Sequence, residues 1–161
     1  MAGAGNLADH DPVAVARQFG EQVPHSRDLG MQVLAMEADQ VRMRLVPGPE
    51  LRADDAAEEL CTSVLYSLVD SACGLAVFAA LQELKPIATL DLRMDYLRPA
   101  ASKRALVAIA HCHHLTDDVA FVRCPVFSEG LDEPVAIGNA TFMRATQGKH
   151  FETTASRGDA A

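Results

Sequence analysis

The stretch from Leu60 to Leu84 constrains the fold more than any other part of the chain. Between Leu60 and Leu81 it is almost wholly apolar, and its one ionisable carboxylate is Asp70. Such a segment is either a membrane-spanning helix, which needs about 20 apolar residues, or a helix buried in a soluble domain. Acidic residues flank it, and neither end carries a Lys/Arg cluster or a Trp/Tyr belt. We therefore expect a buried helix, ending near Leu84, and no membrane span.

The polar residues of this helix are not scattered. Ser63, Ser67, Asp70 and Gly74 follow the spacing i, i+4, i+7, i+11, which places them on one helical face. We call this face the polar stripe. A buried carboxylate is costly unless it is neutralised or hydrogen-bonded. Asp70 is therefore either a structural residue bonded to nearby groups or an acid that lines a cleft.

Length and composition narrow the class of protein. The 161 residues are enough for one domain with a real core, and the apolar content of 49% is ordinary for a globular protein. The net charge of −8 argues against a nucleic-acid-binding surface. The four cysteines form no C-x-x-C pair and are interpreted as free thiols. Together with the absence of a basic and apolar signal sequence at the N-terminus, they predict a cytoplasmic protein.

The rest of the chain predicts one short helix and about six strands. Asp11 and Pro12 are typical of a helix start, and that helix should end near Gly20, before a turn at residues 23–30. Alternating apolar residues and short turns predict strands Met31–Met36, Gln40–Val46, Thr89–Leu97, Ala105–Leu115, Val119–Ser128 and Pro134–Arg144.

Short connections between consecutive strands imply antiparallel pairing. We therefore expect an α+β domain in which one antiparallel sheet wraps around the long central helix. That domain should span residues 11–145, with a disordered segment at 1–10 and a flexible tail at 146–161.

This layout and three sequence blocks resemble the hot-dog fold and, more narrowly, the PaaI-like acyl-CoA thioesterases. The family motif H-G-G-V-x-x-x-L-x-D-x-A corresponds to the stretch from Cys61 to Ala72. The block from Pro86 to Ala100 is similar to the strand that follows the family's helix, and the block from Ile137 to Met143 to its last strand. The resemblance covers about residues 24 to 144.

The resemblance implies hydrolysis of a coenzyme A thioester without a cofactor, in a homodimer or tetramer whose sites lie at the subunit interface. The acid on the helix, here Asp70, is then the nucleophile or the base that activates water. The backbone N–H groups of Thr62 and Ser63 would hold the thioester oxygen. Thr89 occupies the place of a Ser or Thr that positions water or substrate, and usually reaches in from the partner subunit. We expect further substrate contacts from Cys61, Ser67, Gly74, Arg98 and Arg123.

One departure from the family pattern keeps a second function open. Cys61, Thr62 and Ser63 replace His-Gly-Gly, so side chains occupy space that glycine leaves free. The chain is then either a thioesterase with altered substrate or weak activity, or a non-catalytic protein that binds acyl-CoA or another acyl ligand. Fold alone does not decide between these functions.

Two other groups of residues suggest alternative chemistry. On a strand, His111 and His113 would share one face and Cys112 and His114 the other, which leaves too few ligands per face for a zinc site. We expect no metal. Cys61 at a helix start is a candidate nucleophile, but the sequence places no histidine base beside it.

Overall fold

The computed structural model describes residues 14–16, 18, 23–54, 56, 58–83, 85–144 and 146. Residues 14–16 and 18 are helical, in agreement with the expected N-terminal helix, whose remainder lies outside the described residues. The segment predicted to be disordered, 1–10, also lies outside them, as does the predicted tail apart from residue 146.

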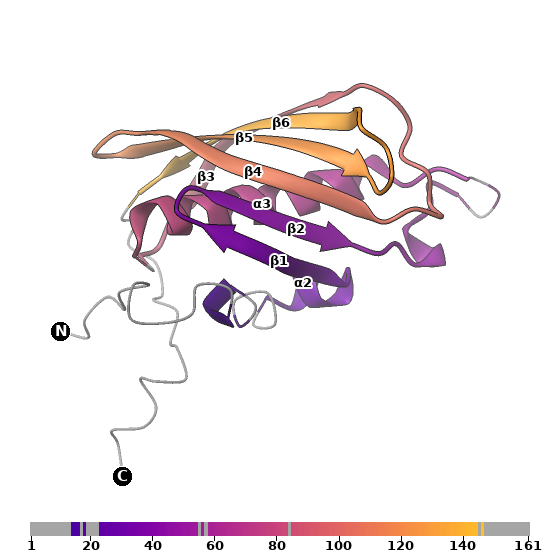
Figure 1. Ribbon diagram of the computed structural model, residues 1–161, viewed down its shortest axis with the longest axis horizontal. Helices are drawn as coiled ribbons and strands as arrows, with labels where there is room; N and C mark the ends of the chain where they lie inside the picture. The colour runs from indigo at the N-terminus through magenta and orange to yellow at the C-terminus, as the bar shows by residue number, and fades with distance from the viewer. Residues whose placement is uncertain are drawn as a thin grey trace, which may run out of the picture.

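The described chain contains six strands and one long helix. In order it forms α2 (Pro24–Asp28), β1 (Met31–Glu37), β2 (Gln40–Leu45), the 3-10 helix η2 (Pro49–Leu51), α3 (Thr62–Leu81), β3 (Ala88–Tyr96), β4 (Leu106–Leu115), β5 (Val119–Ser128) and β6 (Pro134–Met143). The strands make one sheet in the order β1-β2-β4-β5-β6-β3, and every neighbouring pair is antiparallel. The sheet lies across the long helix, with α2 beside β1 (Figure 1). The predicted architecture is confirmed.

The strand ends agree with the sequence prediction to within one residue, and two helical features differ from it by more. The sequence predicts a turn at residues 23–30, but Pro24 begins a short helix there, because proline at the first helical position is already set for helix geometry. The long helix ends at Leu81 rather than near Leu84, because Gln82 adopts the left-handed conformation with φ 54°.

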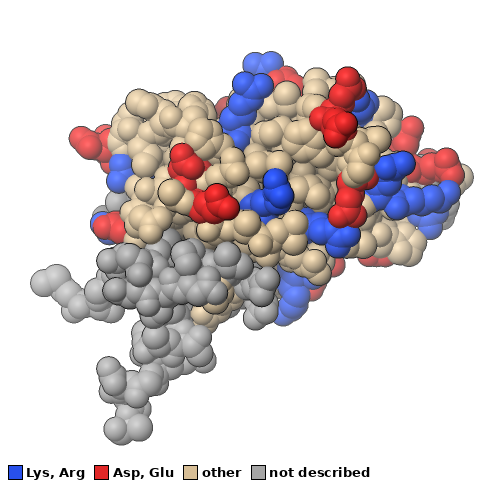
Figure 2. All heavy atoms as spheres, in the orientation of Figure 1, with Lys and Arg blue, Asp and Glu red and all other residues tan. Residues whose placement is uncertain are grey.

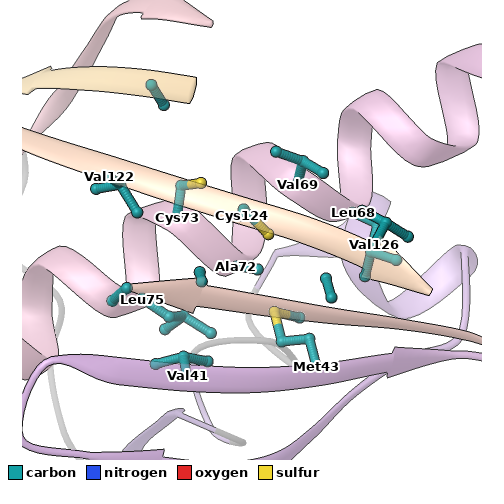
Figure 3. Packing of buried hydrophobic residues seen from close by; sticks show 14 of the residues in the cluster. Val41, Met43, Leu68, Val69, Ala72, Cys73, Leu75, Val122, Cys124 and Val126 are labelled. Carbon is teal, nitrogen blue, oxygen red and sulfur yellow. The ribbon is translucent and has the colours of Figure 1, made fainter. Parts of the chain in front are cut away.

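The core lies between α3 and the concave face of the sheet. Leu68, Ala72 and Leu75 of the helix are buried against Val41 and Met43 of β2 (Figure 3). By length and hydropathy α3 could cross a membrane, but most of it is covered by the sheet, so it is the core helix of the domain.

The cysteines are free, as predicted. Cys73 of α3 and Cys124 of β5 both lie in this core (Figure 3). The neighbouring Cys124 thiol and burial together raise the pKa of Cys73 well above its ordinary value. This thiol therefore stays protonated and packs as a small apolar group.

A glycine in β6 sets how closely α3 approaches the sheet. A Cβ atom on Gly138 would lie 2.4 Å from Cγ1 of Val69 and 3.2 Å from the sulfur of Met94. Val69 is fully buried and β-branched, so its methyl group has little freedom to move away. Gly74 on the helix is different, because its Cβ would meet only ordinary contacts at 3.9 Å.

We predict that Gly138→Ala lowers the free energy of unfolding by about 1–3 kcal/mol, the usual cost of overpacking a core. Chemical denaturation would measure it. Gly74→Ala is the matched control and should be neutral or stabilising by up to about 1 kcal/mol, because alanine favours helix over glycine. The double variant Gly138→Ala/Val69→Ala should lose less free energy of unfolding than the sum of the losses in the two single variants. Equal stability of Gly138→Ala and wild type would contradict this packing.

Candidate active site

The polar stripe lies on the side of α3 that the sheet leaves uncovered. Ser63 is exposed, and Ser67, Asp70 and Gly74 are half-buried, whereas the side of the helix that faces the sheet is buried. The helix thus presents one open polar face of the kind the spacing predicted. A ligand or a second protein chain has access to this face.

Asp70 has a hydroxyl partner on β3. The Thr89 hydroxyl donates a hydrogen bond to Oδ1 of Asp70 at 3.0 Å. A β-bulge lies between Thr89 and Asp91, at the beginning of this strand. Among the described residues, Oδ2 of Asp70 has no hydrogen-bond partner in the protein. The carboxylate is therefore held by one oxygen and can bind water or substrate with the other.

The family resemblance placed Thr89 at the position of a Ser or Thr that usually reaches in from the partner subunit. Within this one chain the Thr89 hydroxyl bonds Asp70. The strand that carries Thr89 runs beside α3, so both groups are fixed to rigid elements of one protomer.

Cys61 caps the start of α3 and occupies part of the space around its first amides. Its sulfur lies 3.1 Å from the Ser63 hydroxyl oxygen. The Ser63 hydroxyl, followed by the nearby Ser63 backbone N–H, lowers the pKa of Cys61. The Cys61 backbone N–H donates to the Leu51 carbonyl at 3.0 Å, which fixes the loop before the helix. Among the described residues no hydrogen bond occupies the backbone N–H of Thr62 or of Ser63, and Cys61 makes no side-chain capping bond to the helix.

One residue near the site, His25, was missed by sequence reasoning. Nε2 of His25 lies 3.0 Å from the Ser67 hydroxyl oxygen. His25 belongs to α2, which packs on α3, and is 42 residues away from Ser67 in the sequence. Pro24 was the signal for a helix here, but no local pattern reveals which side chain on α3 this helix meets.

The other predicted site residues are not all brought to this face. Gly74 lies next to Ile87 and Phe142, toward the far end of the stripe. Arg98 follows β3 and forms an ion pair with Glu133. Arg123 is exposed on β5 between two buried neighbours, so it lies on the outer face of the sheet, away from α3. That face carries interspersed acidic and basic side chains rather than one basic patch (Figure 2).

The histidine-rich end of β4 gathers no metal site among the described residues. His111 bonds Asp39 at 3.1 Å, and His114 packs on Phe121. A β-bulge between Cys112 and His114 breaks the predicted alternation, so Cys112 is buried while His114 is exposed.

Comparison with known proteins identifies the group of proteins to which this arrangement belongs. A family model described as the thioesterase superfamily matches residues 62–135. The medium/long-chain acyl-CoA thioesterase YigI of Escherichia coli K12 is 27% identical over 140 residues, covering 79% of this chain and 88% of YigI. A crystal structure of a Pseudomonas aeruginosa protein has a TM-score of 0.75 and 26% identity, covering 83% of this chain and 99% of that one.

A third similarity is to PaaI, the phenylacetic acid degradation protein of Thermus thermophilus. A variant of that protein is 30% identical, with a TM-score of 0.64, and the match covers 75% of this chain and 98% of PaaI. The sheet wrapped around α3, the carboxylate on that helix and these similarities lead to one assignment. The chain belongs to the thioesterase superfamily and has the hot-dog fold of its PaaI-like members.

Proposed function

We propose that the protein hydrolyses the thioester bond of an acyl-CoA, and that Asp70 carries the reaction. The observation that supports this most directly is the bond from Thr89 to one oxygen of Asp70, on a polar face of an otherwise buried helix. Members of the superfamily act on thioesters, and YigI is described as acting on medium- and long-chain acyl-CoA. Acyl-CoAs of these lengths are therefore the first substrates to test.

The chemistry needs no cofactor. As general base, the free oxygen of Asp70 takes a proton from water while the water oxygen adds to the thioester carbon. As nucleophile, the same oxygen adds to the carbon and forms an anhydride that water then cleaves. In both versions backbone amides stabilise the oxyanion, and the coenzyme A thiolate leaves. Thr89 holds the carboxylate in place for either version.

The amides and the carboxylate of one helix are too far apart to act on one carbonyl group. Thr62 and Asp70 are eight residues apart, which is about 12 Å along a helix axis. A reacting atom must lie about 3 Å from both the oxyanion donors and the attacking group. We propose that each site combines Asp70 and Thr89 of one copy with the Thr62 and Ser63 amides of a second copy.

Strand β3 is the edge along which two copies would join. It is the last strand of the described sheet, beside β6. Several large apolar side chains are exposed at or near it: Tyr66, Leu90, Tyr96, Leu97 and Met143. An apolar edge strand readily pairs with another chain.

The direction of β3 fits this arrangement. Its first part contacts Asp70 through Thr89, and its last residue, Tyr96, donates to the Thr62 carbonyl at 3.4 Å. Antiparallel pairing of two β3 strands around a twofold axis would place the beginning of one beside the end of the other. The amides of one copy would then approach the carboxylate of the second.

A specific observation also supports a second candidate function. The side chains of Cys61 and Ser63 are in contact at 3.1 Å at the start of α3, beside the amides to which a substrate oxygen would have to bind. A protein in which these side chains block the amides would bind an acyl-CoA without hydrolysing it. This non-catalytic function remains the alternative.

Asp70→Asn should lower kcat for acyl-CoA hydrolysis by about 10²–10⁴-fold and leave the fold intact, because the amide is isosteric but is neither base nor nucleophile. Release of the coenzyme A thiol measures the rate, and thermal unfolding checks the fold. Asp117→Asn, which changes an exposed carboxylate in the β4–β5 turn, is the control and should match wild type. Full activity in Asp70→Asn would refute the role, and a large loss of stability would indicate a structural carboxylate.

The shared site predicts complementation between two inactive variants. Thr62→Pro removes one amide at the first helical position, and the extended conformation of Cys61 before it suits proline. It should lose about 10²-fold in kcat. A heterodimer of Thr62→Pro with Asp70→Asn, purified through two different tags, should recover about half the wild-type rate, because one of its two sites is complete. Activity no higher than that of the two parent variants would contradict a shared site.

Restoring His-Gly-Gly at positions 61–63 should raise kcat/KM for a simple acyl-CoA by about tenfold, equal to about 1.4 kcal/mol of transition-state binding. The reason is that the change removes the contact between the Cys61 and Ser63 side chains and clears the side chains of Thr62 and Ser63 from the approach to the amides. Parallel assays of wild type and triple variant over an acyl-CoA panel would test this. A fall in activity on the best wild-type substrate would show that Cys-Thr-Ser is fitted to that substrate instead.

A further inference from the structure

We infer that His25 is a positioning residue for the hydrolytic water, acting through the Ser67 hydroxyl. The inference rests on the proposed thioester hydrolysis and extends it to residues outside the Asp70–Thr89 pair. It assigns Ser67 a contact with the attacking water, and His25 the task of orienting Ser67.

The Ser67 hydroxyl bonds a side chain outside its own helix. A serine inside a helix ordinarily turns its hydroxyl back to the carbonyl group one turn earlier. Here the Ser67 oxygen lies 3.0 Å from Nε2 of His25 instead. If the hydroxyl donates its proton to Nε2, the lone pairs of Ser67 are left to accept a hydrogen bond from another molecule on the stripe.

Ser67 and Asp70 are spaced so that one water molecule could bridge them. Side chains three residues apart on a helix are neighbours, with about 5–6 Å between their Cβ atoms. A single water molecule between the two oxygens would make two hydrogen bonds of about 2.8 Å each. One hydrogen of that water would point to the free oxygen of Asp70 and the other to Ser67.

This arrangement directs the reactive lone pair of the water. With both hydrogens engaged, the lone pairs of the water oxygen face away from the helix, toward the open side where the thioester binds. Asp70 takes one proton as the oxygen adds to the carbonyl carbon, and the coenzyme A thiolate leaves when the tetrahedral intermediate collapses. Ser67 accepts a hydrogen bond throughout and is not itself acylated.

The helix α2 is anchored, as it must be if His25 is to position another residue. Ser26, next to His25, is 3% exposed. The His25 carbonyl accepts the Leu29 N–H at 3.0 Å, and Gly30 turns the chain into β1 with φ 68°. A side chain on such an anchored element is placed more accurately than one on a free loop.

The test compares kcat and KM of four variants on an acyl-CoA that wild type hydrolyses. His25→Phe keeps an aromatic ring but removes the acceptor, and Ser67→Ala removes the hydroxyl. Each should lower kcat by about tenfold and change KM by less than about twofold, because water positioning affects the transition state more than substrate binding. The double variant should be no slower than either single variant, since both act through one contact.

His25→Gln is the conservative rescue, because its amide oxygen can accept the Ser67 proton. It should recover most of the rate that His25→Phe loses. His113→Phe, an exposed histidine on β4, is the matched control, and unfolding midpoints verify that every variant is folded. Wild-type kcat in His25→Phe, additive losses in the double variant, or no rescue by glutamine would overturn the inference. If wild type turned over no acyl-CoA, the proposed function and this inference would both be overturned. If Asp70→Asn lost activity while the His25 and Ser67 variants kept the wild-type kcat, only this inference would be overturned.

Discussion

The burial of one long apolar helix is the constraint on which the rest of the structure depends. α3 has buried side chains along its whole length, so the sheet must curve around the helix. Gly138 shows how close this contact is, because even one methyl group there would meet Val69 at 2.4 Å. The side of α3 left open carries the polar stripe, and the site exists because the sheet does not close over it.

The same constraint explains why one chain is insufficient for the proposed chemistry. A rigid helix places its first amides about 12 Å along the axis from the backbone of Asp70, and an aspartate side chain is too short to bridge that distance. Hydrophobic residues left exposed along β3 and the need for a second set of amides both favour a second copy at the same edge. The proposed dimer and the proposed catalysis would then both follow from one packing arrangement.

Much of this could be predicted from the sequence, because the signals were local. The alternation of Val119–Ser128 predicted that strand with its observed ends, and the apolar run predicted α3 to within three residues of its end. The bond between His25 and Ser67 could not be predicted, since it joins residues 42 apart and depends on how α2 packs. The β-bulge after Cys112 was also missed, because it depends on how the neighbouring strand pairs.

The most direct test of the account is the release of coenzyme A thiol by the purified wild-type protein from short, medium, long and aromatic acyl-CoAs. We predict catalytic turnover on at least one acyl class, with one equivalent of free acid formed for each thiol. Saturable binding of acyl-CoA without thiol release from any of them would contradict hydrolysis at Asp70 and identify the site as a binding site on an enzyme fold.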